Sequence, residues 1–159
     1  MNITIVCIGK LKERYWADAV QEYSKRLGKH CLLTIRELKE EKLRDDPSKA
    51  EEDAVKEAEG RSILGCLKSD ALVIALDIKG TLLSSEELSA RINQAGINGT
   101  SSITFIIGGS IGLSDEVLER ADLRLSFSKM TFPHQMMRVI LLEQIYRSFK
   151  IIKNEPYHK

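Results

Sequence analysis

The stretch Ala-Leu-Val-Ile-Ala-Leu at residues 71–76 is apolar at every position, and it decides the fold class. A strand with one solvent-facing side alternates between apolar and polar residues, whereas a continuous apolar run predicts a central strand buried on both faces. Helices must then cover both sides of its sheet. The run Asp-Ile-Lys-Gly at 77–80 follows, and its simplest interpretation is a β-turn with glycine at a positive φ.

Apolar residues at strand period recur on either side of this stretch, and segments of helical period separate them. The other predicted strands are 3–8, 31–38, 103–107 and the shorter 123–127. The predicted helices are 16–27, 47–67, 85–95, 115–121 and 133–152. Capping signals mark three of the helix starts, namely Asp46-Pro47, Ser84 with Glu87, and Ser114.

Strands and helices alternate along the chain, which predicts an α/β fold with a mostly parallel sheet flanked by helices. With 159 residues the chain has the length of one domain, and we expect 1–159 to form it. Ligands of such sheets bind beyond the carboxyl ends of the strands. The segments that follow strands are therefore the candidates for a functional site.

The composition, with 43% hydrophobic and 30% charged residues, is typical of a soluble globular protein. No apolar run approaches the ~20 residues that cross a bilayer, and the N-terminus lacks a signal-peptide pattern, so we expect a cytoplasmic protein without membrane contact. Cys7, Cys31 and Cys66 lie in or beside apolar stretches and predict buried free thiols. Three scattered cysteines and three scattered histidines predict no metal site.

Charge is distributed unevenly along the chain. Residues 37–59 contain ten acidic and five basic residues, whereas residues 123–159 contain seven basic and two acidic residues. A basic C-terminal part is typical of proteins that contact a polyanion. The exposed face of an amphipathic helix would have a similar composition, so both interpretations stay open on charge alone.

The glycine-rich segment Ile-Ile-Gly-Gly-Ser-Ile-Gly at 106–112 follows a predicted strand and precedes a capped helix. Glycines there let a ligand approach the main chain, whose free amides can bind an adenosyl or phosphate group. The spacing matches neither the dinucleotide fingerprint nor the P-loop, which argues against a nucleoside triphosphatase. A tight turn without a ligand is the alternative.

The segment Phe-Ser-Lys-Met-Thr-Phe-Pro-His at 127–134 joins the last predicted strand to the longest helix. It gathers hydroxyls, an ammonium group and the His134 imidazole, which an inert linker does not need. Arg138 lies one helical turn further along, so both side chains can point to the same side. The alternative is that His134 is an ordinary surface residue.

The tail Asn-Glu-Pro-Tyr-His-Lys at 154–159 closes the chain without apolar periodicity. An aromatic ring, an imidazole and an ammonium group in succession suit stacking on an RNA base and contact with its phosphate. Chain ends are commonly frayed and without function, which is the alternative interpretation.

Five segments stand in one order: Ile-Gly-Lys-Leu-Lys at 8–12, Ile-Gly-Gly-Ser-x-Gly at 107–112, Ser-Phe-Ser-Lys-Met-Thr-Phe-Pro-His-Gln at 126–135, Glu-Gln-x-Tyr-Arg at 143–147 and the ending Pro-Tyr-His-Lys. Together they resemble the ribosomal RNA large subunit methyltransferase H family, a small branch of the SPOUT methyltransferases, over the whole chain. Ile111 departs from the family's pattern, in which a polar or acidic residue is usual, but Gly108 and Gly109 are in place.

The resemblance implies a C-terminal trefoil knot, S-adenosylmethionine bound in it, and a homodimer. The implied reaction methylates N3 of a pseudouridine in large-subunit (23S) ribosomal RNA, within the assembled ribosome. The expected cofactor contacts are Leu76, Gly108, Phe127, Ser128, Lys129, Met130, Thr131 and Phe132. The expected substrate contacts are His134, Tyr157, His158 and Lys159.

We expect Tyr157, His158 and Arg138 to be catalytic. An unperturbed imidazole titrates near neutrality, so His158 is the first candidate to assist the N3 proton. Tyr157 would orient the base, and Arg138 would hold a phosphate or a developing uracil anion. Glu143 and Arg147 are four residues apart and predict an ion pair on one helix face.

Two other functions remain possible from the sequence. A ribosome-binding or assembly factor would share the basic C-terminal part but would need no cofactor. A nucleotide hydrolase could use the glycine-rich segment, although the chain lacks the Gly-Lys-Ser/Thr of a P-loop and an obvious cluster of metal-binding carboxylates.

Overall fold

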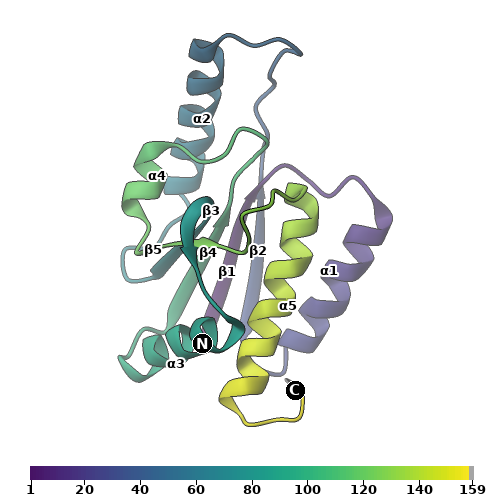
Figure 1. The fold of residues 1–159 in the computed structure, drawn as a ribbon, viewed down its shortest axis with the longest axis vertical. Helices are drawn as coiled ribbons and strands as arrows, with labels where there is room; N and C mark the ends of the chain where they lie inside the picture. Colours follow the sequence, from purple (N-terminus) through teal and green to yellow (C-terminus); the bar gives the residue numbers. More distant parts are fainter. Residues whose placement is uncertain (158–159) are drawn as a thin grey trace.

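Five parallel strands form one sheet in the order β2-β1-β4-β3-β5 (Figure 1). They are β1 (Asn2–Ile8), β2 (Leu32–Leu38), β3 (Leu72–Leu82), β4 (Ser102–Ile107) and β5 (Leu123–Ser126). The computed structural model describes residues 1–157 of the chain. The prediction of an α/β fold with a mostly parallel sheet is confirmed, and β3 lies inside the sheet, between β4 and β5.

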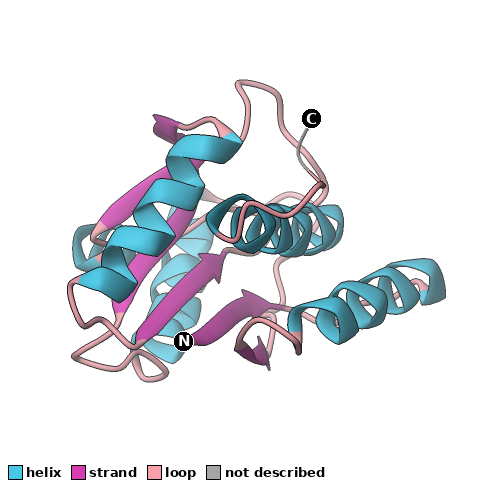
Figure 2. Cartoon of the chain, turned by 90° about the horizontal axis from the view of Figure 1, so that it is seen from below, coloured by secondary structure: helices cyan, strands magenta, loops and turns pink. Residues whose placement is uncertain are grey.

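Helices cover both faces of the sheet (Figure 2). They are α1 (Arg14–Leu27), α2 (Lys49–Leu64), α3 (Ser85–Ile97), α4 (Asp115–Arg120) and α5 (His134–Ile152). On one face α1, α3 and α5 pack on side chains such as Ile5 and Phe105, and on the other α2 and α4 pack on Val6 and Ile106. Neighbouring residues of a strand thus enter opposite cores, so the central strands have no polar side.

The predicted start of α2 is wrong. The N-cap is Ser48 rather than Asp46: its hydroxyl accepts a hydrogen bond from the Glu51 amide at 3.3 Å, and the Glu51 carboxylate accepts one from the Ser48 amide at 2.8 Å. This reciprocal pair satisfies two free N–H groups, which explains why the helix begins there. The predicted caps Ser84 and Ser114 are confirmed.

Strand β3 is longer than predicted, because residues 77–80 form an irregularity within it instead of a β-turn. Its pairing with β5 jumps from Leu76 opposite Leu125 to Thr81 opposite Leu125. A Cβ atom at Gly80 would lie 2.6 Å from the carbonyl carbon and oxygen of Arg124. Gly80 is therefore required for close approach of two main chains. Its φ is not positive, so the predicted reason for a glycine at this position is wrong.

The three thiols are free, as predicted, but differ in burial. Cys7 is buried, whereas Cys31 and Cys66 are half-buried. Burial raises the pKa of Cys7 to about 11, with a smaller upward contribution from Glu37 and an opposing one from Arg138. Such a thiol is almost entirely protonated at neutral pH and is a weak nucleophile.

Within residues 1–157, no helix is long and apolar enough to cross a membrane. The trefoil knot stays a prediction, because the order of the strands does not define how the chain is threaded.

Candidate active site

A cavity of about 380 Å³ opens at the carboxyl ends of β3, β4 and β5. The residues that line it are Leu76, Asp77, Ile78, Ile107, Gly108, Gly109, Ser110, Gly112, Leu113, Leu125, Ser126, Phe127, Ser128, Met130, Thr131, Phe132, His134 and Met137. They come from the end of β3, the loop after β4, the loop after β5 and the first turn of α5. Both the place and the volume are those of small-molecule sites in α/β proteins.

The loop after β4, residues 108–112, is closed by its own main chain, and we call it the glycine loop. The Gly112 amide donates to the Gly109 carbonyl at 3.2 Å, and Gly112 has a φ of +87°, which favours glycine. A Cβ atom at Gly108 would lie 3.0 Å from the Gly112 carbonyl group. The loop therefore presents main chain to the cavity, and Ile111 does not line it.

The loop after β5 is shaped by two serines. The Ser126 hydroxyl donates to the Ser128 carbonyl at 3.0 Å, and the Ser128 hydroxyl accepts from the Met130 amide at 3.0 Å. These local bonds turn the chain so that it wraps the cavity. The side chains of Met130 and Phe132 remain 73% and 39% exposed, which leaves large apolar groups at the cavity's rim.

The third wall contains a carboxylate that the residue predictions missed. Asp77 lines the cavity and accepts hydrogen bonds from Arg124 on β5, from Nε at 2.9 Å and from Nη2 at 2.5 Å. Its other oxygen accepts from the Lys79 amide at 3.2 Å. The sequence offers one signal for Asp77 as a site residue, namely its position directly after a buried central strand.

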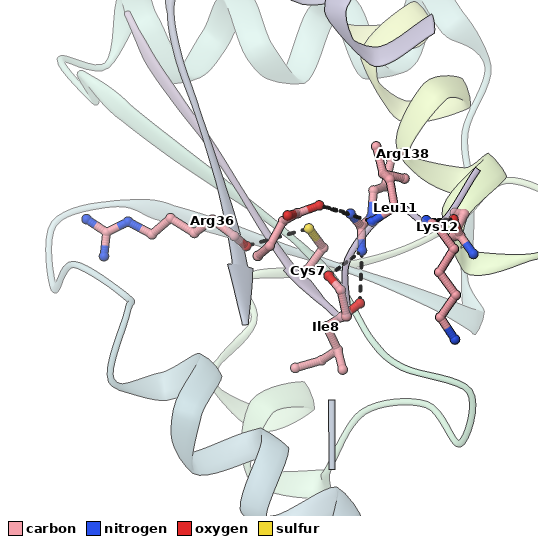
Figure 3. A network of polar contacts seen from close by, with 9 residues as sticks. Cys7, Ile8, Leu11, Lys12, Arg36 and Arg138 are labelled. Atoms are coloured by element: carbon pink, nitrogen blue, oxygen red, sulfur yellow. Dashed lines mark hydrogen bonds and ion pairs between the residues drawn. The ribbon is translucent and has the colours of Figure 1, made fainter. Parts of the chain in front are cut away.

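Arg138 does not line the cavity. It lies in a buried network of polar contacts (Figure 3). The residue is 2% exposed, and Nη1 donates to Glu37 Oε1 at 2.6 Å. Nη2 donates to the main-chain carbonyls of Ile8 at 3.0 Å and Gly9 at 2.8 Å. The guanidinium thus holds the end of β1, the end of β2 and α5 together.

Two further bonds hold the loop that follows β1. The Leu11 amide donates to Glu37 Oε1 at 3.3 Å, and the Lys12 amide donates to Gln135 Oε1 at 2.8 Å (Figure 3). Because Gln135 is the second residue of α5, this loop is fixed next to the helix turn that lines the cavity.

The structure brings most of the predicted site residues together. Seven of the eight expected cofactor residues line the cavity, as does His134 of the expected substrate group. Lys129 belongs to the same loop but does not line it, and Arg138 is absent from the lining. Met137 was missed, although it stands three residues after His134 on the same helix, a spacing that places two side chains on one face.

Tyr157, the last residue that the structure describes, does not line the cavity and packs on the C-terminal half of α5. Its ring lies 5.0 Å from that of Tyr146 and 4.8 Å from the Arg147 guanidinium, and its hydroxyl donates to Glu143 at 3.4 Å. The predicted pair of Glu143 and Arg147 is confirmed at 2.7 Å. The rise along α5 puts Arg147 roughly 20 Å from His134. His158 and Lys159 lie outside the described residues.

The described part of the chain contains no group of three or more histidine, cysteine, aspartate or glutamate side chains that could hold a metal ion. The polar groups that line the cavity are main-chain amides, hydroxyls, the Asp77 carboxylate and the His134 imidazole.

The whole chain is similar to known methyltransferases. A family model described as predicted SPOUT methyltransferase matches residues 1–158. Proteins called ribosomal RNA large subunit methyltransferase H from Clostridium kluyveri, Clostridium perfringens and Clostridium novyi are 56%, 57% and 58% identical to it over 159 residues, with 100% of both chains covered. A solved structure of a probable methylase family protein from Haemophilus influenzae shares the fold, with a TM-score of 0.54 and 16% identity over 99% of this chain and 70% of that one.

Proposed function

Because the chain belongs to the SPOUT methyltransferase family, with relatives called ribosomal RNA large subunit methyltransferase H along its full length, we propose that it methylates N3 of a pseudouridine in large-subunit ribosomal RNA with S-adenosylmethionine as the donor. One observation carries this proposal. The cavity at the carboxyl edge of the sheet is lined by seven of the eight residues that the family resemblance implies for the cofactor.

The cavity's chemistry fits this cofactor. Leu76, Leu125 and Met137 supply apolar walls for an adenine ring, and the main chain of the glycine loop and of 127–132 supplies donors and acceptors for its polar edges. A side chain at Gly108 would press against Gly112, so the backbone is the surface offered there. When bound, S-adenosylmethionine supplies an electrophilic methyl group on a sulfonium.

The protein's part in such a transfer is to place the donor and the acceptor in line, which supplies about 7–11 kcal/mol in well-oriented reactions. The loop after β5 and the first turn of α5 border the same cavity, and we propose that His134 contacts the target base there. The N3 proton must leave during attack, and a positioned base contributes ~10²–10⁴-fold. We propose His158 for that role, with Tyr157 and Lys159 orienting the base.

For Arg138 the geometry favours a supporting role over the expected catalytic one. Both of its Nη atoms are engaged with protein acceptors, and the residue is buried. Through these bonds it fixes the loop after β1, where Lys10 and Lys12 are exposed. We propose that these two lysines contact RNA phosphates beside the cavity, as basic side chains next to a nucleic-acid site do.

We also propose that the protein acts as a homodimer. Tyr157 packs on α5 at Glu143, Tyr146 and Arg147, roughly 14–20 Å along the helix from His134, and we infer that the tail of a second copy reaches this cavity. The exposed Met130 and Phe132 at the cavity's rim supply apolar surface for such an association.

The test is transfer of a tritiated methyl group to large ribosomal subunits, intact ribosomes and naked ribosomal RNA, followed by mapping of the labelled base. We expect one methyl group per particle, at N3 of a pseudouridine, with intact ribosomes as the best substrate. Particles from a strain that leaves the target uridine unisomerised are the matched control and should stay unlabelled. Tight ribosome binding without S-adenosylmethionine binding would instead support an assembly factor.

A further inference from the structure

Glu59 is a buried carboxylate with one oxygen that lacks a hydrogen-bond partner. The residue lies on α2 and is 4% exposed. Its Oε1 accepts from the Glu41 amide at 3.1 Å, whereas its Oε2 is buried without a partner within the part of the chain that the structure describes. A buried acceptor without a donor is unfavourable, and more so when the group is charged, so it calls for a physical reason.

The free oxygen faces the glycine loop from behind the cavity. A Cβ atom at Gly109 would lie 3.0 Å from Glu59 Oε2, and 3.2 Å from the Ile8 side chain. Helix α2 packs closely against the start of α4 here, because a Cβ at the next residue, Gly60, would lie 2.2 Å from the Ser114 hydroxyl oxygen. Ser114 caps α4, directly after the glycine loop, so α2, the loop and α4 form one packed unit (Figure 1).

We propose that Glu59 is a positioning residue for the cofactor: when S-adenosylmethionine occupies the cavity, Oε2 accepts a hydrogen bond from a main-chain N–H of the Gly109–Ser110 step and fixes the glycine loop against the ligand. This inference rests on the proposed function. Gly109 lines the cavity and is the residue of the loop that lies against Oε2, so the proposed bond requires that a main-chain rotation of the loop turns an amide toward this oxygen.

The carboxylate is suited to this task because it offers an acceptor on each oxygen. One is used by the Glu41 amide in the structure, and the other is left for the loop. A glutamine of the same shape has a single acceptor oxygen and could serve the Glu41 amide or the loop, but not both.

The surroundings of Glu59 predict a linkage between cofactor binding and protonation. Burial raises its pKa, the Glu41 amide opposes the shift, and the carboxylates of Glu40 and Glu41 add to it. The groups that face it from β1 and the glycine loop are Ile8 and Gly109, and neither carries a charge. A new N–H bond would favour the anion, so cofactor binding should release protons and weaken as pH falls through this raised pKa.

The experiment compares Glu59→Gln and Glu59→Ala with the matched exposed controls Glu57→Gln and Glu57→Ala, two residues away on the same helix. Calorimetry gives the Kd for S-adenosylmethionine at pH 7 and pH 5, thermal unfolding checks the fold, and hydrogen exchange reports the Gly109 and Ser110 amides. We expect both Glu59 variants to bind about tenfold more weakly or worse at pH 7, and the controls to bind as the wild type does.

Two signatures separate positioning from simple support of the fold. The pH 5 to pH 7 gain in affinity should be present in the wild type and absent in Glu59→Gln, and the cofactor should slow exchange at Gly109 or Ser110 in the wild type. If the wild type binds but Glu59→Gln binds equally well, or if exchange at both amides is unchanged in the wild type, the role of Glu59 is refuted and the proposed function stands. If the wild type binds no S-adenosylmethionine, the proposed function itself fails.

Discussion

Arg138 and Glu37 are joined by a 2.6 Å contact between Nη1 and Oε1, although 101 residues of chain separate them. The same guanidinium caps the carbonyls of Ile8 and Gly9. The first turns of α5, which line the cavity, are therefore fixed to the carboxyl ends of β1 and β2. The geometry of the cavity depends on an arginine that does not line it.

Arg138→Ala should lower the free energy of unfolding by about 3 kcal/mol, because it leaves Glu37 and two buried carbonyls without their donor. Urea unfolding followed by circular dichroism measures this loss. The control is Arg14→Ala, which removes an exposed ion pair with Asp18 on α1 and should cost at most about 1 kcal/mol. Equal losses in the two variants would contradict the structural role of Arg138.

Gly80→Ala should disturb both stability and cofactor binding. Its Cβ would lie 2.6 Å from the carbonyl group of Arg124 and 2.9 Å from that of Asp77, and main-chain atoms cannot move aside cheaply. We expect a loss of about 1–3 kcal/mol in stability and a weaker Kd, since Asp77 lines the cavity. Gly65→Ala meets atoms no closer than 3.5 Å and is the control. A Gly80→Ala protein with wild-type Kd and unfolding midpoint would disprove the close approach.

Gly108→Val should reduce S-adenosylmethionine affinity at least tenfold, a change of about 1.4 kcal/mol. The new side chain would press against the Gly112 carbonyl group and Leu113, and the glycine loop must then open. Equilibrium dialysis with labelled cofactor measures the Kd, and Gly28→Ala, at the end of α1, should leave it unchanged. Retained affinity in Gly108→Val would show that the cofactor does not contact this loop.

Deletion of residues 157–159 should abolish methyl transfer and leave cofactor affinity within about threefold of the wild type, because no tail residue among those described lines the cavity. A mixed dimer of one tail-deleted chain and one Gly108→Val chain tests which copy supplies the tail. If the tail serves the partner's cavity, this dimer regains transfer in its one intact cavity. Unchanged single-turnover transfer by the deleted protein would remove the tail from the mechanism.

Cys7 should resist alkylation in the folded protein. It has no exposed surface and its pKa is raised to about 11, so at pH 8 the thiolate fraction is about one in a thousand. Iodoacetamide labelling followed by peptide mass spectrometry should modify Cys7 in urea but not in native buffer. Rapid native labelling would show that the end of β1 opens locally.

The strands and most helix starts were predictable because their signals are local. A continuously apolar stretch such as 72–76 has few alternatives to a buried strand, and Ser84 with Glu87 satisfies a helix start within four residues. The predicted start of α2 was wrong because two capping signals, Asp46-Pro47 and Ser48 with Glu51, stand next to each other. The helix begins after Ser48, whose capping box satisfies more N–H groups.

The remaining features depend on partners that are distant in sequence. Arg138 shares a helix turn with His134, and spacing alone suggested a shared task, but its acceptors Ile8 and Gly9 are 130 and 129 residues away. The jump in β3 depends on the main chain of Arg124, which no pattern around Gly80 encodes. In the sequence Glu59 is one of ten acidic residues of a charged segment. Only the fold distinguishes it, by burying its free oxygen beside Gly109.

Every residue that lines the cavity comes from residues 76–137, and none comes from β1, α1, β2 or α2. The earlier portion of the chain reaches the cavity only from behind: Glu37, Ile8 and Gly9 hold Arg138 of α5, and Glu59 lies beside Gly109. Sequence drift on the outer faces of α1 and α2 can therefore leave the donor chamber intact, as long as inward contacts such as those of Glu37 and Glu59 are retained.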